Sequence, residues 1–130
     1  MTINMLRQVM LVEDDPDIAS LIKLSLEEFG GLSVAHFASG RAALNAIGEI
    51  SPNLVILDYR MPEMDGGEVI AELRGNESTQ TIPVIFMTAS VMPEHVERLR
   101  KMGAAAVIAK PFDPLTLPDQ IAEIWSKLKP

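Results

Sequence analysis

Cysteine is absent from the 130-residue sequence. This absence excludes a disulfide framework, a thiol nucleophile and a zinc site built on cysteine thiolates. Aromatic residues are scarce, at 5%, and no apolar run approaches the ~20 residues that a membrane-spanning helix needs. The apolar stretch near the N-terminus runs directly into the acidic residues Glu13 to Asp15, which is not the layout of a secretory signal peptide. We therefore expect a cytoplasmic protein without a membrane segment.

Basic residues are outnumbered by acidic ones, 11 to 18, which gives a formal net charge of −7. This balance disfavours binding to nucleic acids or anionic membranes, because both need a positive surface. Hydrophobic residues make up 48% of the chain and charged residues 22%, which is close to the composition of a globular protein and excludes wholesale disorder. The length suits one hydrophobic core, so we expect residues 1–130 to form a single domain with its core at about 7–128.

Short apolar runs alternate along the chain with longer stretches of helical period. The pattern predicts five strands, each followed by a helix, at residues 9–12, 32–37, 54–57, 83–87 and 104–109. The strand runs are continuously apolar, which is typical of a parallel sheet covered by helices on both faces. The predicted fold is therefore a doubly wound α/β sandwich of three layers. Ligands of such folds bind beyond the carboxyl ends of the strands.

The first predicted helix begins at Pro16, with Asp15 as its N-cap, and ends at Gly30. Its helical period predicts a buried stripe of four residues: Ile18, Leu21, Ile22 and Phe29. The next helix is expected to be capped by Ser39.

Acidic, hydroxyl and basic side chains follow the predicted strands at their carboxyl ends: Glu13 and Asp14 after the first, Asp58 after the third, Thr88 after the fourth and Lys110 after the fifth. Three carboxylates at one edge repel one another, which is costly unless a cation lies among them. Carboxylate oxygens without histidine or cysteine suit Mg²⁺. A metal, a hydroxyl and an ammonium around a further carboxylate predict a phosphoryl-transfer site with Asp58 as the nucleophile.

The strand ends also carry four motifs, LVEDD (11–15), LDYRMPEMDG (57–66), MTA (87–89) and KPF (110–112). In this order the motifs resemble those of the receiver domain of two-component response regulators, over about residues 7–128. The resemblance implies a flavodoxin-like (βα)5 fold with the strand order 2-1-3-4-5. It also implies a phosphorylation-controlled signalling switch, which is not an enzyme acting on other molecules because it catalyses only its own phosphorylation and dephosphorylation.

The resemblance assigns roles to individual residues. Asp58 is expected to accept the phosphoryl group, and Thr88 and Lys110 are expected to contact it. The family also implies a cis peptide bond between Lys110 and Pro111.

A Mg²⁺ ion is the cofactor that the resemblance implies. Its expected ligands are the carboxylates of Glu13, Asp14 and Asp58, directly or through water, and the backbone carbonyl of Arg60. The expected phosphoryl donor is a sensor histidine kinase or a histidine phosphotransfer protein. A stand-alone receiver would pass the signal to a downstream protein target. A receiver that is part of a longer regulator would pass it to an output domain. A homodimer through the last two helices and the last strand is an additional expectation.

One position departs from the family pattern. Many receivers carry an aromatic residue three positions before the conserved lysine, and here that position is Val107. We therefore expect the signal to pass through residues 89–93 and the helix after them. We also hypothesise that Arg60 and Ser90 set the lifetime of the aspartyl phosphate, since they flank the path of the attacking water in this family.

Three other functions are compatible with parts of this pattern. A degenerate receiver that acts only by binding is one alternative, although the complete acidic set argues against it. A phosphohydrolase with an aspartate nucleophile is another, but Arg60 stands where such enzymes usually have a second acid. A flavodoxin-like cofactor binder would need a phosphate-binding loop after the first strand, where this chain has acidic residues.

Several polar residues have plainer interpretations. His36 and His95 are too far apart in the pattern to form a site together, and we assign both to structural or surface roles. Asp65 before Gly66 is expected to form a turn. Tyr59 is expected to pack beside the site.

Overall fold

Five parallel strands form the centre of the fold in the computed structural model, which describes residues 6–128. The strands are β1 (Gln8–Val12), β2 (Ser33–Phe37), β3 (Leu54–Asp58), β4 (Val84–Thr88) and β5 (Ala106–Ala109). Their order in the sheet is β2-β1-β3-β4-β5, so the predicted doubly wound topology is confirmed. The predicted strands are all present and differ from the observed ones only at their ends.

Burial on both faces explains the continuous apolar runs of the central strands. Every residue of β3 and of β4 is buried, whereas the edge strands β2 and β5 are partly exposed. A strand covered on both faces has no solvent side, and alternation of polar and apolar residues is lost. The polar residues Asp58 and Thr88 are the last residues of these two central strands, where the sheet meets solvent.

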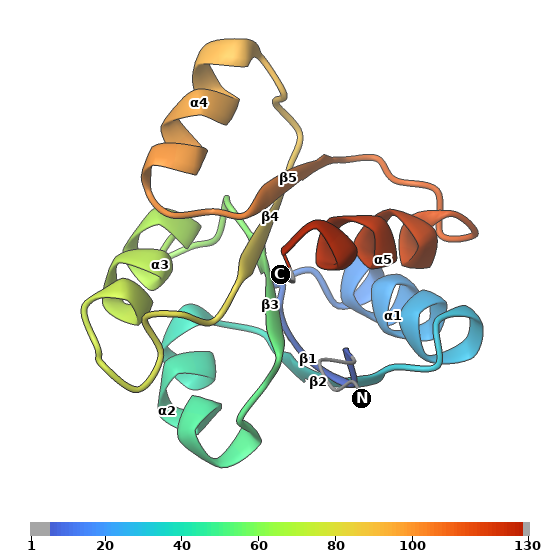
Figure 1. Ribbon diagram of the computed structural model, residues 1–130, viewed down its shortest axis with the longest axis horizontal. Coiled ribbons are helices and arrows are strands. Elements are labelled where there is room, and N and C mark those ends of the chain that lie inside the picture. Colours follow the sequence, from blue (N-terminus) through green and yellow to red (C-terminus); the bar gives the residue numbers. More distant parts are fainter. Residues whose placement is uncertain (1–5, 129–130) are drawn as a thin grey trace.

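Helices cover both faces of the sheet (Figure 1). One face carries α1 (Pro16–Leu24), the short π-helix η1 (Ser25–Phe29) and α5 (Leu117–Leu128), and the other carries α2 (Gly40–Ile50), α3 (Gly66–Arg74) and α4 (Pro93–Lys101). Each helical layer forms a separate hydrophobic core with one face of the strands. The expected three-layer arrangement is therefore confirmed. Among residues 6–128, no helix combines the length and apolar character needed to cross a bilayer.

The first helix departs from its predicted buried face. Regular α-helix ends at Leu24 and continues as a π-helix to Phe29. Ile22 and Leu26 are completely buried, whereas Leu21 is 42% exposed and Phe29 is 60% exposed. The prediction is wrong for Leu21, which lies beside the buried stripe. It is wrong for Phe29 because the wider π-helical turn changes the 3.6-residue period on which the prediction rested.

Side-chain caps fix two of the helices that begin next to the carboxyl edge of the sheet, α1 and α3. The Asp15 carboxylate accepts hydrogen bonds from the backbone of the first turn of α1, as predicted. Asp65, expected to form a turn, is the N-cap of α3 and makes a capping box with Glu68. Gly66 follows it at a position where a Cβ atom would lie 2.6 Å from the ring of Phe86 and 2.9 Å from the carbonyl oxygen of Asp58. Only glycine therefore lets α3 begin this close to the end of β3.

Candidate functional site

The carboxyl ends of the strands bring the predicted site residues to one edge of the sheet. Asp58 ends β3, Thr88 ends β4, and Lys110 directly follows β5. The backbone amide of Lys110 donates to the carbonyl of Thr88 at 2.8 Å, so the two residues are held in register. Glu13 directly follows β1, and its amide donates to the Phe37 carbonyl at 3.1 Å. The Lys110–Pro111 peptide bond is cis, as expected.

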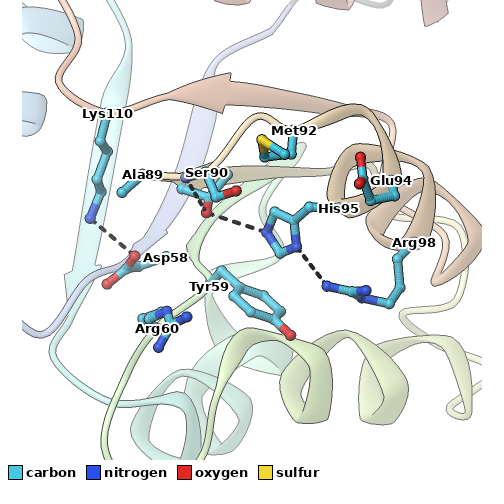
Figure 2. Close-up of a pocket in the computed structure, with 11 residues that line it drawn as sticks. Asp58, Tyr59, Arg60, Ala89, Ser90, Met92, Glu94, His95, Arg98 and Lys110 are labelled. Carbon is cyan, nitrogen blue, oxygen red and sulfur yellow. Dashed lines mark hydrogen bonds and ion pairs between the residues drawn. The ribbon is translucent and has the colours of Figure 1, made fainter.

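Lys110 bridges two buried carboxylates. Its Nζ lies 2.9 Å from Oε1 of Glu13 and 3.0 Å from Oδ1 of Asp58. Glu13 is only 1% exposed and Asp58 only 6%. Figure 2 shows the Lys110 side chain extending toward Asp58. A single ammonium group thus compensates two acids that have little access to water.

Burial raises the pKa of Asp58 from 3.8 to about 6. The hydrogen bond from Lys110 works in the opposite direction, and the nearby charge of Glu13 adds to the increase. Burial alone would lower the pKa of Lys110, but its hydrogen bonds to Glu13 and Asp58 outweigh this and raise the pKa. At neutral pH the site therefore contains an ionised but poorly solvated Asp58 next to a firmly protonated Lys110.

Three carboxylates at this edge are arranged as a potential cation site. Oxygen atoms of Glu13, Asp14 and Asp58 all lie within 4.8 Å of one another. All three are hard oxygen donors, the type that Mg²⁺ prefers; Glu13 and Asp58 are buried, and Asp14 is exposed. The donor set therefore fits the expected ion. Arg60 lines the adjoining cavity, and the role of its carbonyl as a further ligand remains a prediction.

A cavity of about 570 Å³ opens beside Asp58, between the end of β3, the loop after β4 and the first turns of α4. Thr88 and Lys110 line it together with two further cations, Arg60 and Arg98. Positive groups in a concave site attract anions. This one cavity is therefore lined by the three groups expected from the sequence: the Asp58 carboxylate, the Thr88 hydroxyl and the Lys110 ammonium. It can receive an anionic group.

His95 also lines this cavity, and the sequence analysis missed it. Its Nε2 lies 3.4 Å from the Thr88 hydroxyl oxygen, and its ring meets Tyr59 edge to face with centroids 5.1 Å apart. The sequence feature that could have pointed to His95 is its position in the first turn of the helix that follows Thr88. His36 lies elsewhere, where its Nε2 is 2.8 Å from the Glu13 carbonyl oxygen, in keeping with a structural role.

Comparisons with known proteins agree with this arrangement. The family model described as "Response regulator receiver domain" matches residues 9–122. The polar-differentiation response regulator DivK of Brucella ovis is 37% identical over 108 residues, which cover 83% of this chain and 87% of that protein. The chemotaxis protein CheY4 of Vibrio cholerae superposes with a TM-score of 0.85 at 27% identity, over 92% of this chain and 99% of that one. The signal receiver domain of a histidine kinase from Syntrophus aciditrophicus gives a TM-score of 0.81 at 35% identity, covering 95% of this chain and 92% of that chain.

Proposed function

The chain belongs to the response regulator receiver domain family, and from that premise we propose that it accepts a phosphoryl group on Asp58 and acts as a phosphorylation-controlled switch. The observation that carries the proposal is the Lys110 ammonium, 3.0 Å from a buried Asp58 carboxylate and 2.9 Å from Glu13. The donor would be a sensor histidine kinase or a histidine phosphotransfer protein, as is general in this family.

The transfer makes one bond and breaks another. An oxygen of Asp58 attacks phosphorus, the bond between phosphorus and the donor's imidazole nitrogen breaks, and that nitrogen keeps the bonding electrons. Lys110 pairs with an oxygen of the transferred group, and the Thr88 hydroxyl donates a hydrogen bond to another. A Mg²⁺ ion held by Glu13, Asp14, Asp58 and the Arg60 carbonyl would supply positive charge that offsets the charge of the phosphoryl oxygens.

Hydrolysis of the aspartyl phosphate would reset the switch. Arg60 and Ser90 line the same cavity as Asp58, and their side chains would control the approach of water to phosphorus. We therefore propose that Arg60 and Ser90 determine how long Asp58 stays phosphorylated.

The experiment that tests this proposal is incubation with Mg²⁺ and acetyl phosphate, followed by intact mass spectrometry. We expect one phosphoryl group on the wild-type protein and none on Asp58→Asn. Asp119→Asn, which removes an exposed acid on α5, should still be phosphorylated and is the matched control. If neither acetyl phosphate nor a histidine kinase modifies the wild-type protein, the proposal is wrong and the binding-only receiver takes its place.

The phosphohydrolase alternative has a separate readout. Steady release of phosphate from an added phosphomonoester, with loss of the activity in Asp58→Asn, would favour it over the switch. We propose instead that the chain modifies only itself, as one receiver domain in the cytoplasm, and that its output passes by contact to a downstream protein or output domain. A homodimer through α4, β5 and α5 would be one such contact.

A further inference from the structure

A series of three contacts runs from the end of β4 through the loop after it and into the first turns of α4 (Figure 2). Nη2 of Arg98 lies 3.0 Å from Nδ1 of His95. On the other side of the ring, Nε2 of His95 lies 3.4 Å from the hydroxyl oxygen of Thr88. The backbone amide of Ser90 donates to the same oxygen at 3.3 Å. The hydroxyl expected to contact the phosphoryl group is therefore already in contact with two nitrogen atoms.

The chemistry of Arg98 decides which nitrogen of His95 carries the proton. A guanidinium group has only donors, so Nδ1 of His95 accepts this hydrogen bond and carries no proton. A neutral imidazole then has its proton on Nε2, the atom that faces Thr88. This tautomer follows from the hydrogen-bond partners. His95 therefore donates to the Thr88 hydroxyl oxygen.

Thr88 consequently receives two N–H donors on one oxygen. A hydroxyl group accepts two hydrogen bonds and donates one. With its acceptor sites facing Ser90 and His95, Thr88 retains its own O–H for donation elsewhere. The two contacts are long, so they bias the direction of the hydroxyl and do not lock it.

Tyr59 fixes the plane of the imidazole from a second direction. Its ring meets His95 at an interplanar angle of 77°, and it also meets Phe86 of β4 edge to face, with centroids 5.8 Å apart. His95 is thus held by the guanidinium at Nδ1 and by an aromatic ring that is itself packed on the sheet. Such support gives a side chain one preferred orientation.

We propose that His95 is a positioning residue that directs the proton of the Thr88 hydroxyl toward the phosphoryl group on Asp58. This inference rests on the proposed function and deepens it, since a phosphoryl oxygen can only accept a hydrogen bond. His95 does not touch the reacting atoms in this arrangement; it acts through Thr88.

Two substitutions separate this role from simple packing. In His95→Gln the side-chain amide can place an N–H near the position of Nε2, whereas in His95→Asn the shorter amide reaches only the position of Nδ1. We expect His95→Asn to lower the maximal rate of phosphorylation by acetyl phosphate about 3- to 10-fold, the size of one modest hydrogen bond. His95→Gln should recover most of that rate. Equal loss in both variants would overturn the proposal.

The same substitution in a Thr88→Ala background provides the second test. If His95 acts through the hydroxyl, His95→Asn should have no further effect on the rate once that hydroxyl is gone. A purely structural role would lower the rate again in the double variant, and this result would also overturn the proposal. Thermal unfolding of each variant shows whether it is folded at the assay temperature.

Nitrogen NMR of the His95 ring decides the tautomer without any phosphorylation. We expect a proton on Nε2 in the wild-type protein and a shift toward the other tautomer in Arg98→Ala. A proton on Nδ1 in the wild-type protein would refute the inference. If the wild-type protein accepts no phosphoryl group, the proposed function is wrong. The NMR spectrum of the ring still shows in that case whether the His95 nitrogen that faces Thr88 carries the proton.

Discussion

Neutralising Asp58 should stabilise the folded chain when no divalent cation is present. The pKa of Asp58 rises from 3.8 to about 6 because burial and the charge of Glu13 outweigh the hydrogen bond from Lys110. A rise of this size corresponds to about 3 kcal/mol of unfavourable free energy for the ionised group at neutral pH. The hydrogen bond from Lys110 is already included in this net shift. Asparagine removes the buried charge, so we expect Asp58→Asn to gain up to about 3 kcal/mol in the free energy of unfolding at neutral pH.

The sign of the pH dependence follows from the direction of the shift. An acid with a raised pKa in the folded state favours folding while it is protonated and loses that contribution as it ionises. Well below pH 3.8, the ordinary pKa of an aspartate, Asp58 is protonated in both the folded and the unfolded state, so the variant and the wild-type protein should be nearly equal in stability. The difference in the free energy of unfolding between Asp58→Asn and the wild-type protein should increase as the pH rises to about 6, and it should stay constant above that value.

Urea unfolding in a chelating buffer measures this difference directly. The matched control is Glu77→Gln, which removes an exposed negative charge from the loop after α3 and should change the free energy of unfolding by less than about 0.5 kcal/mol. The reasoning is refuted if Asp58→Asn is no more stable than the wild-type protein at neutral pH. It is also refuted if the gain is as large at acid pH as at neutral pH.

Four further predictions follow from the same arrangement. Mg²⁺ should raise the unfolding temperature of the wild-type protein and raise that of Asp14→Asn much less; equal shifts would argue against the carboxylate site. Gly66→Ala should destabilise the fold by about 1–3 kcal/mol in urea unfolding because its Cβ has no space, while Gly48→Ala, with open space around the new atom, should be neutral or stabilising. Arg60→Ala should shorten the lifetime of the aspartyl phosphate several-fold, and an unchanged decay of the phosphorylated mass would show that Arg60 has no such role. A phosphoryl mimic should alter amide exchange within residues 90–102, and no change there would contradict the expected signalling route.

The fold could be predicted from the sequence because its determinants are local. Continuous apolar runs correctly predicted that the central strands are buried on both faces. The N-caps Asp15 and Ser39 were also predicted at the right positions. The strand order depends on which strands pair across the sheet, and that information came from the family resemblance. Site residues at strand ends could be proposed as a group, since parallel strands end at one edge.

Other features depend on geometry that the sequence pattern does not contain. The π-helix after Leu24 changes the helical period, so Phe29 is exposed although the regular period predicts burial. The bridge from Lys110 to Glu13 joins residues 97 positions apart in the chain. His95 was missed because its partner is a hydroxyl on a neighbouring strand, and a single histidine in an exposed helix gives no pattern of its own.

The contacts of Thr88 also suggest how this chain signals with Val107 in place of an aromatic residue. Val107 is a partly buried aliphatic residue packed against the core beneath α3 and α4, so it offers no ring that could move beside Thr88. The ring next to Thr88 is instead that of His95, which belongs to α4 and is connected through its other nitrogen to Arg98 one turn later. Any shift of the Thr88 hydroxyl toward a phosphoryl group therefore lengthens or redirects a contact with α4 itself. This arrangement favours the start of α4, rather than β5, as the first element to respond.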